Sequence, residues 1–317
     1  MIGTDILMAK KLLEAGEVVG IPTETVYGLA GNAFNDDAVL QIFKVKNRPQ
    51  FDPLIVHTNS LEKVKTFVTD FPEKAEQLAS VFWPGPLTLL LPKADSISDL
   101  VTSGLGTVAV RIPNHPLTLE LLSVLDFPLA APSANPFGYI SPTSAQHVDK
   151  QLGEKIAYIL DGGASQVGIE STIVGFEEAE TIVYRLGGAS VEAIEKVVGS
   201  VRLVAHSSSN PKAPGMLKSH YSPRKPLFID SLEKVLTKYP NQVVGYLSFQ
   251  TSSDVLPLEH QRVLSPTGNY AEAAKHLFAY MRQLDALSID VICTELLPEK
   301  DLGRAINDRI RRAAVRE

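Results

Sequence analysis

Polar and charged side chains gather in one stretch near the start of this 317-residue chain. Residues 20–57 contain Ile-Pro-Thr-Glu-Thr-Val-Tyr-Gly, then Lys46 and Arg48, and then a short apolar run that ends at His57. A flexible ammonium beside a planar guanidinium suits phosphate oxygens, because one neutralises charge while the other fixes geometry. The stretch therefore predicts a polyanion site beside the site of a small polar substrate.

The spacing of the two cations adds a structural expectation. Pro49 disfavours helical backbone at Arg48, so we expect the end of this segment to be extended. Side chains two residues apart on an extended chain point the same way, and Lys46 and Arg48 would then face one target. A solvated basic helix end near the negative pole of the helix dipole explains the pair equally well. Other segments must decide between the two.

A second polar segment lies between two prolines at residues 132–136. The prolines favour extended backbone and place Ser133 and Asn135 on one side of the chain. The segment follows the apolar run 127–131 and precedes a helix that we expect over 143–152. Small hydrogen-bonding groups at the end of a strand are typical of the carboxyl edge of an open sheet, where ligands bind. Turn chemistry alone is the alternative explanation.

Composition excludes several classes of protein. The net charge of −6 argues against a general nucleic-acid or membrane binder, which usually carries a basic excess. The chain has no signal-peptide pattern and no run of about 20 apolar residues, so we expect a cytoplasmic protein. Its single cysteine, Cys293, excludes an internal disulfide and lies in an apolar run that indicates a buried thiol. P-loop, dinucleotide and His-Glu-x-x-His motifs are missing.

Hydrophobic periodicity and capping signals predict a mixture of helices and strands over residues 1–203. We expect helices from Thr4 to Gly16, from Asn35 or Asp36 to Phe43, from Glu73 to Phe82, from Pro116, and over 143–152. We expect strands over 18–21, 53–57, 87–91, 107–112, 156–160, 171–176 and 181–185, with a further short run that ends at Ala131. Strict alternation is missing, so the order favours a twisted mixed sheet of the α/β class over a doubly wound one.

The chain is long enough for two domains, each with its own core. Residues 204–225 are rich in Ser, Pro and Gly, and we expect them to form a linker. Residues 226–317 then repeat strand and helix signals and predict a small α/β domain. Its expected strands are 227–229, 243–247 and 290–294, and its expected helices are 269–284 and an Arg-rich segment from Asp301.

Eight motifs in fixed order resemble those of the YrdC-like threonylcarbamoyl-AMP synthases along about the first 200 residues. They are Pro22-Thr-Glu-Thr-Val-Tyr-Gly28, Lys46-Asn-Arg48, Pro53-Leu-Ile-Val-His57, Trp83-Pro-Gly-Pro-Leu-Thr88, Val108-Ala-Val-Arg-Ile-Pro113, Ser133-Ala-Asn135, Glu170-Ser-Thr-Ile-Val174 and Arg185-Leu-Gly187. Beyond them, Ala213-Pro-Gly-Met216 and His220-Tyr-Ser-Pro223 resemble the linker of the long, two-domain form of this family.

The resemblance implies a fold and a reaction. The fold is a YrdC-like twisted mixed sheet with flanking helices, joined to a small Rossmann-like C-terminal domain. The reaction combines L-threonine, bicarbonate and ATP, with Mg²⁺ assisting, to give threonylcarbamoyl-AMP and pyrophosphate. The product feeds the transferase machinery that modifies adenosine 37 of tRNA, and any direct contact with tRNA is expected to be weak and local.

The resemblance also implies roles for individual residues. The threonine side matches Thr25, Tyr27, His57, Arg111, Ser133 and Ser171, with the Arg111 fork suited to a carboxylate. The ATP side matches Lys46, Arg48, Asp52, Thr107, Asn135, Ser141, Thr143, Arg185, Gly215, His220 and Tyr221, of which Lys46 and Arg48 are the catalytic candidates; the metal ligands stay unassigned. The less favoured alternative is that Tyr27 and His57 are satisfied core residues and Arg185 a surface strand residue. We assign His57 to binding and orientation rather than to general-base catalysis.

Two local features carry expectations of their own. Residues 213–221 would fold across the nucleotide mouth as a lid that excludes water from a labile anhydride, a passive connector being the alternative. Asp52 and Asn47 depart from the family pattern, in which a neutral Asn and a Gly are more common. A carboxylate at Asp52 is able either to help hold Mg²⁺ or to repel the triphosphate.

Two other functions compete with the synthase. One is a carbamoyl transferase for another acceptor, although this chain lacks the zinc-finger cysteines and acylphosphatase-like N-terminus of such proteins. The other is an RNA-binding module with a basic groove and no turnover. The acidic net charge weakens the second.

Overall fold

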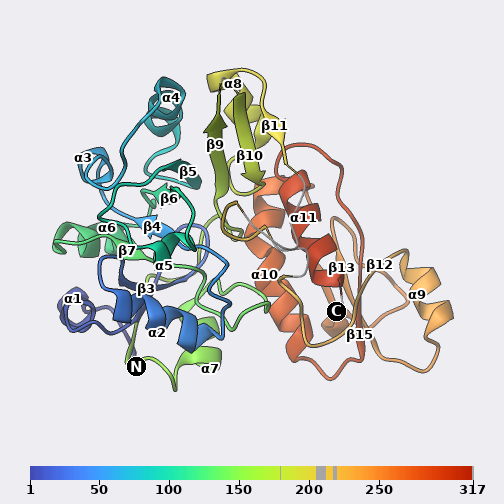
Figure 1. The fold of residues 1–317 in the computed structure, drawn as a ribbon. Helices are drawn as coiled ribbons and strands as arrows, with labels where there is room; N and C mark the ends of the chain where they lie inside the picture. The colour runs from blue at the N-terminus through green and yellow to red at the C-terminus, as the bar shows by residue number, and fades with distance from the viewer. Residues whose placement is uncertain (179, 205–211, 217–219, 316–317) are drawn as a thin grey trace.

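The computed structural model describes residues 1–178, 180–204, 212–216 and 220–315. Within these residues the strands form two sheets, one of eleven strands and one of four. In Figure 1 the large sheet lies in the blue to yellow part of the chain and the small sheet in the orange to red part. The predicted α/β fold class, with a mixed sheet and a smaller second domain, is confirmed.

The large sheet is mixed. In sheet order its strands are β1 (Ile2–Gly3), β8 (Tyr158–Leu160), β2 (Val19–Ile21), β3 (Gly28–Asn32), β7 (Leu129–Ala130), β4 (Ile55–His57), β6 (Thr107–Arg111), β5 (Leu87–Pro92), β9 (Thr172–Glu177), β10 (Glu180–Arg185) and β11 (Arg202–Leu203). β4 is parallel to β6 but antiparallel to β7, and β5 is antiparallel to β6 but parallel to β9. The first of these pairings sets His57 opposite Arg111 at one end of both strands.

Eight helices of the described chain accompany this sheet. They are α1 (Ile6–Glu14), α2 (Asp36–Lys46), α3 (Leu61–Val64), α4 (Glu73–Phe82), α5 (Asp99–Thr102), α6 (Pro116–Ser123), α7 (Ala145–Leu152) and α8 (Val191–Val198). The Asn35 side chain begins α2 by accepting the backbone N–H groups of Asp37 and Ala38. Asp5, and not the expected Thr4, begins α1, because its carboxylate accepts two backbone N–H groups where the helix dipole favours negative charge.

The end of α2 corrects an expectation about the two cations. The helix continues through Lys46, and Asn47 then adopts left-handed backbone with φ of 52°. The extended Lys46–Arg48 segment predicted from Pro49 is therefore wrong. Asn tolerates left-handed backbone better than most residues and commonly follows the last helical residue, so the chain turns at Asn47.

The C-terminal domain contains a four-stranded parallel sheet. Its strands are β12 (Leu227–Ile229), β15 (Val291–Thr294), β13 (Val244–Ser248) and β14 (Gln261–Val263), and its helices are α9 (Leu232–Lys238), the 3₁₀ turn η1 (Leu258–His260), α10 (Tyr270–Ala286) and α11 (Gly303–Ala314). Cys293 is buried in β15, as its apolar neighbours predict. In Figure 1, α10 and α11 are the helices of this domain that stand nearest the large domain.

The two domains share apolar packing. Val26, Ile140 and Ile169 of the large domain belong to the same buried cluster as Phe278 of α10 and Ile306 of α11. Contact is close enough to require glycine at residue 168, where φ is 80° and a Cβ atom would lie 2.4 Å from the backbone of α10. The helices of the C-terminal domain are therefore fixed against the large domain.

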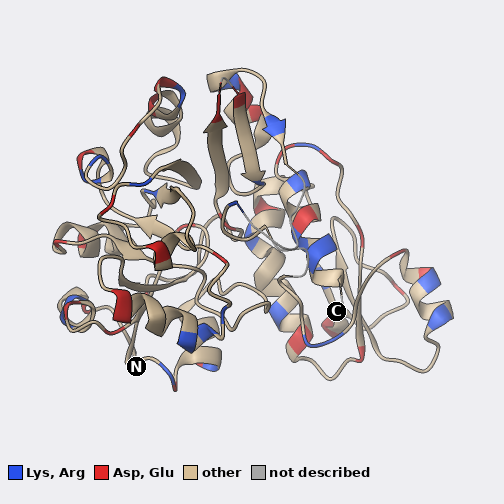
Figure 2. Cartoon of the chain, viewed as in Figure 1, with Lys and Arg blue, Asp and Glu red and all other residues tan. Residues whose placement is uncertain are grey.

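Charge is mixed over the molecule. Figure 2 shows acidic and basic residues interspersed along the helices of both domains, as the modest net charge leads one to expect. None of the helices within the described residues combines the length and the apolar character needed to cross a bilayer.

Candidate active site

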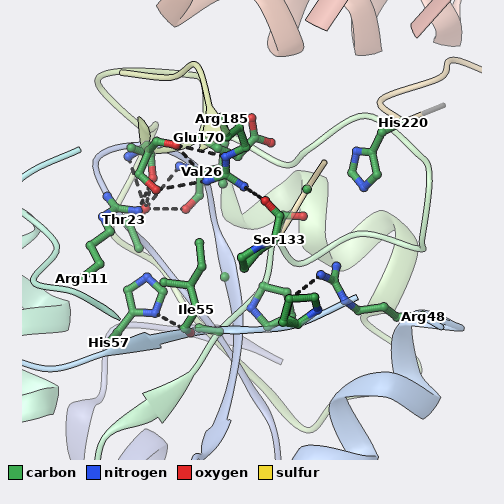
Figure 3. Close-up of a pocket in the computed structure, with 18 of the residues that line it drawn as sticks. Thr23, Val26, Arg48, Ile55, His57, Arg111, Ser133, Glu170, Arg185 and His220 are labelled. Atoms are coloured by element: carbon green, nitrogen blue, oxygen red, sulfur yellow. Dashed lines mark hydrogen bonds between the residues drawn. The ribbon is translucent and has the colours of Figure 1, made fainter. Parts of the chain in front are cut away.

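A pocket lies at the ends of the central strands, between the large domain and the linker. Its cavity volume is about 50 Å³, below the range of about 300 to 1,000 Å³ typical of small-molecule sites. Its lining comprises Thr23, Thr25, Val26, Gly28, Arg48, Pro53, Ile55, His57, Arg111, Ala131, Pro132, Ser133, Glu170, Ser171, Arg185, Pro214, Gly215, His220 and Tyr221. Figure 3 shows Arg111 and His57 on one side of this space and Arg48 and His220 on the other.

Arg111 anchors one end of the pocket. Its Nη2 lies 2.6 Å from Oε1 of Glu24, and Nη1 donates to Oγ1 of Thr25 at 2.9 Å. Nε donates to the carbonyl oxygen of Gly85 at 3.1 Å. The guanidinium is thus held in place from three directions, with its fork beside the hydroxyl of Thr25.

Arg185 of β10 and Ser171, the residue before β9, also line the pocket. Nε and Nη2 of Arg185 donate to the carbonyl oxygen of Ser171 at 3.1 and 2.9 Å, and Nη2 also donates to its Oγ at 3.1 Å. The Ser171 hydroxyl lies 2.7 Å from Oγ1 of Thr88. These bonds join Arg185 to neutral oxygens, while its charge also acts on the nearby carboxylate of Glu170.

The other lining arginine, Arg48, is held beside a carboxylate. Its Nη2 lies 2.9 Å from Oδ2 of Asp52 and 2.9 Å from the carbonyl oxygen of Pro53. Asp52 is completely buried and does not line the pocket. The carboxylate that departs from the family pattern therefore serves as the ion-pair partner of Arg48.

Lys46 reaches a different target from Arg48. Its ammonium donates to the carbonyl oxygens of Ser133 and Asn135 at 2.5 and 2.6 Å, and its side chain is buried. Burial lowers the pKa of Lys46, and nearby Arg48 lowers it further. The common target expected for the two cations is thus not found: Lys46 fixes the loop that carries Ser133, and Arg48 faces the pocket.

The linker contributes to the pocket on both sides of residues 217–219, which are not described. Pro214 and Gly215 line it, with the Gly215 N–H donating to Oδ1 of Asp52 at 3.4 Å. His220 and Tyr221 also line it, and their rings meet edge to face with centroids 4.3 Å apart. Four residues of the predicted lid segment therefore line the pocket, whereas residues 217–219 lie outside the described residues.

Two buried histidines report on the charge in the pocket. Burial lowers the pKa of His57 to about 3, with a further contribution from Arg111, so this imidazole is neutral at physiological pH. Burial also lowers the pKa of His220, and Arg312, Arg48, Lys46 and Arg185 lower it further. Both side chains therefore experience a positive field, which suits an anionic ligand.

Some predicted site residues lie behind the pocket wall. The Tyr27 hydroxyl donates to the carbonyl oxygen of Gly163 at 2.7 Å, and the Asn135 amide donates to those of Pro136 and Tyr139. The Ser141 hydroxyl donates to Oε1 of Glu170 at 2.5 Å, and the Thr143 hydroxyl lies 3.3 Å from Nδ1 of His147. Thr107 stands at the far end of β6 from Arg111 and is not brought to the pocket.

Sequence reasoning did not single out three residues that shape the site. Glu24 pairs with Arg111, Glu170 lines the pocket, and Arg309 of α11 contacts Glu170. Glu24 and Glu170 lie inside two of the quoted motifs, next to Thr and Ser residues. A carboxylate among such hydroxyls in a motif was a signal that could have marked both residues as part of the site. Nothing in the local sequence of Arg309 indicates its partner, which is 139 residues away.

The described residues contain no cluster of side chains suited to bind a resident metal ion. No group of three or more His, Cys, Asp or Glu side chains among them is arranged to hold one. The carboxylates around the pocket already lie beside arginines: Glu24 beside Arg111, and Asp52 beside Arg48. The donor set does not fit a metal ion bound by the protein alone.

Comparisons with known proteins follow the same motifs. The Sua5/YciO/YrdC family model, described as Telomere recombination, matches residues 11–187, and the one described as Threonylcarbamoyl-AMP synthase, C-terminal domain, matches residues 189–315. The threonylcarbamoyl-AMP synthase of Pyrococcus abyssi is 38% identical over 98% of this chain and 94% of its own length. The chain belongs to the threonylcarbamoyl-AMP synthase family. Another member, from Bacillus subtilis, is 38% identical over 98% of this chain and 92% of its own.

Solved structures of the family agree with the fold. The crystal structure of P. abyssi Sua5 complexed with L-threonine matches with a TM-score of 0.92 and 38% identity, covering 98% of this chain and 94% of that one. More distant matches show the fold alone. Escherichia coli YciO has a TM-score of 0.52 at 19% identity over 59% of this chain and 93% of its own, and full-length HypF has 0.52 at 22% over 58% of this chain and 29% of its own.

Proposed function

We propose that this chain is an L-threonylcarbamoyladenylate synthase, which forms threonylcarbamoyl-AMP and pyrophosphate from L-threonine, bicarbonate and ATP. The observation that carries the proposal is the match, over 98% of the chain, to relatives named threonylcarbamoyl-AMP synthase. A pocket with three arginines and several hydroxyls supports it, because the reaction brings several anions together.

The chemistry takes place in two steps. The amino group of threonine attacks the carbon of bicarbonate, and loss of water gives a carbamate. A carbamate oxygen then attacks the α-phosphorus of ATP, the bond to the β-phosphate oxygen breaks, and pyrophosphate leaves. The protein must hold two anions in line and stabilise the leaving group, so catalysis rests on positioning and electrostatics.

Threonine occupies the Arg111 end of the pocket in this proposal. The carboxylate of the amino acid meets the guanidinium of Arg111, and the hydroxyls of Thr25, Ser133 and Ser171 supply hydrogen bonds to its polar groups. His57 is neutral and lies opposite Arg111 on the adjacent strand. It orients the substrate without taking up its proton. Tyr27 supports this end from behind through its bond to Gly163.

ATP occupies the side formed by Arg48, Arg185 and the linker. Arg48 and Arg185 meet the phosphates, and His220 and Tyr221 give the nucleotide an aromatic border. Lys46 is a positioning residue, because its ammonium holds the Ser133 loop through two carbonyl oxygens. Asn135, Ser141 and Thr143 act in the same way, by fixing the backbone behind the nucleotide side.

Mg²⁺ enters as part of the substrate. The carboxylates next to the pocket are paired with arginines, and Mg²⁺ in nucleotide sites commonly keeps several waters and is held mainly by phosphates. We therefore propose that the ion arrives as the Mg²⁺ complex of ATP and assign it no ligand from this chain. It supplies charge neutralisation on the phosphates.

The product is a labile mixed anhydride, which needs a prompt acceptor. We propose that a tRNA threonylcarbamoyl transferase consumes it to modify adenosine 37. Linker residues at the pocket would close over the nucleotide and exclude water until transfer.

Pyrophosphate release tests the proposal. The purified chain with MgATP, L-threonine and bicarbonate should release pyrophosphate, and omission of any one substrate should abolish the signal. Release that persists without threonine would contradict the synthase. A parallel filter-binding titration with tRNA distinguishes the synthase from the RNA-binding module. The module requires tight RNA binding without turnover.

A further inference from the structure

One residue of the C-terminal domain reaches across the domain boundary to the pocket wall. Arg309 of α11 places Nε 3.2 Å and Nη2 3.1 Å from Oε2 of Glu170. The Arg309 side chain is completely buried, and Glu170 is 7% exposed. Glu170 lines the pocket, whereas no described residue of 226–317 does so.

Glu170 is also held from within the large domain. The hydroxyl of Ser141 donates to its Oε1 at 2.5 Å, so the two carboxylate oxygens are bound by two different domains. Burial raises the pKa of Glu170, but Arg309, Arg185, the Ser141 hydroxyl and the backbone N–H of Glu170 together leave the pKa below its ordinary value. The carboxylate is therefore ionised, and its negative charge depends on neighbouring arginines.

The remaining contacts of Arg309 fix the guanidinium itself. Its Nη1 donates to the carbonyl oxygen of Leu186, next to Arg185, and lies 3.0 Å from Oδ2 of Asp308. The guanidinium carbon lies 5.5 Å from the centre of the Tyr221 ring. Arg312, one helical turn further along α11, lies 4.7 Å from the same ring. One face of α11 thus contacts both Glu170 and the linker residue that lines the pocket.

We infer that Arg309 is a positioning residue for the reaction proposed above, through which the C-terminal domain completes the pocket wall. Arg309 holds the Glu170 carboxylate and thereby helps to fix the adjacent Ser171. Arg185 donates a hydrogen bond to the carbonyl oxygen of the same Ser171. It also supports Tyr221 at the nucleotide side. The inference rests on the proposed function, since its measure is turnover.

Loss of this arginine has a definite electrostatic consequence. Without it, Glu170 keeps the desolvation that raises its pKa and loses the main charge that lowers it. A buried carboxylate left in that state takes up a proton or turns away from the wall. The ionised carboxylate, once turned away, displaces Ser171, whereas protonation removes the unpaired charge. The defect should therefore depend on the charge of Glu170 and weaken as the pH falls.

The test uses the full-length chain and pyrophosphate release. Arg309→Met should lower kcat/KM for ATP about 10- to 100-fold at pH 7.5. The double variant Arg309→Met with Glu170→Gln should recover at least tenfold of that loss, because no unpaired charge remains. The ratio of Arg309→Met activity to wild-type activity should rise as the pH falls from 8 to 6, whereas the ratio for the double variant should stay flat. Arg309→Lys, which keeps the charge without the fork, should lie between.

Arg304→Met is the matched control. Arg304 also lies on α11 and pairs across the domain boundary, with Glu192 of α8 at 3.2 Å, but at a partly exposed site away from the pocket. Thermal unfolding of every variant identifies any that fail to fold. If Arg309→Met is one of them, Arg309→Lys is compared with the wild type and with Arg304→Met instead. We expect Arg304→Met to keep wild-type turnover.

Three results would overturn the inference. Arg309→Met with wild-type kcat/KM would show that the contact does not affect the reaction. Equal losses in Arg304→Met and Arg309→Met would show that general domain docking is responsible. A double variant no better than Arg309→Met, at every pH, would show that the charge of Glu170 is irrelevant. Each result requires a wild-type chain that releases pyrophosphate, so a failure of the proposed function itself is recognised separately.

Discussion

Glu24 and Arg111 form a buried ion pair of 2.6 Å at the end of the pocket where we place threonine. The two residues come from different motifs, and the pair fixes the guanidinium before any substrate arrives. A substrate carboxylate at this position would add a second negative charge beside Arg111. Glu24 therefore sets how strongly Arg111 attracts the amino acid.

Replacing Glu24 with Gln should make stability depend on threonine. Removing one member of a buried pair leaves an uncompensated charge, typically at a cost of about 3 to 5 kcal/mol, so Tm should fall. Saturating L-threonine supplies the missing carboxylate and should raise Tm of Glu24→Gln more than that of the wild type. Differential scanning fluorimetry measures both shifts. Equal threonine-induced shifts in the two proteins would contradict the placement of the carboxylate at Arg111.

Arg185 should affect ATP more than threonine. Arg185→Lys loses the planar fork that holds Ser171 and faces the phosphates. A charge-assisted hydrogen bond contributes about 1.5 to 3 kcal/mol, so kcat/KM for ATP should fall about 10- to 100-fold. Arg202→Lys is the control, because Arg202 is exposed and pairs with Glu177 and Glu180. Indistinguishable kinetics in the two variants would argue against a phosphate role for Arg185.

Gly215 couples the linker to Arg185. Its φ is 72°, and an added Cβ would lie 2.9 Å from Nη1 of Arg185. Gly215→Ala should therefore displace the guanidinium and raise KM for ATP at least tenfold. Gly199→Ala provides a control with a similarly positive φ, since Gly199 has φ of 79° and open space around it. An unchanged KM in Gly215→Ala would show that the linker does not bear on the nucleotide side.

His57 makes a prediction about pH. Its pKa is about 3 in the folded chain and about 6.5 when unfolded, so the unfolded state binds the proton first. His57 therefore destabilises the protein progressively as the pH falls from about 6.5 towards 3, by about 2 kcal/mol at pH 5. Chemical denaturation should show that His57→Gln loses less stability than the wild type between pH 7 and pH 5. The same loss in both proteins would contradict a neutral, buried imidazole.

The elements foreseen from sequence are those with strong local signals. The helix Glu73–Phe82 follows a proline and has acidic residues in its first turn, and its bounds were predicted as they stand. Strand β3 (Gly28–Asn32) was not predicted, because two glycines and an alanine give it little strand propensity and its pairing with β2 and β7 creates it. Helix α8 was missed although Ser190 begins it as an N-cap.

The site divides in the same way. Motif resemblance named Arg111, Ser171 and Arg185, which the fold brings to one pocket. Lys46 binds the Ser133 loop and Arg48 lines the pocket because Asn47 between them adopts left-handed backbone. No local sequence rule required that conformation. The partner of Glu170 depends on how α11 docks, and docking is set by apolar packing between residues more than a hundred positions apart. Such pairings form only in the tertiary structure and cannot be predicted from a single sequence.

Following the carbon of bicarbonate into the product tests the proposed reaction itself. The chain is incubated with MgATP, L-threonine and ¹³C-labelled bicarbonate, and the nucleotides are analysed at once by mass spectrometry. We expect a threonine-containing adenylate that is one mass unit heavier than the product of unlabelled bicarbonate, formed in step with pyrophosphate. AMP and pyrophosphate without this labelled adduct, or an adduct that lacks the label, would contradict the proposed reaction.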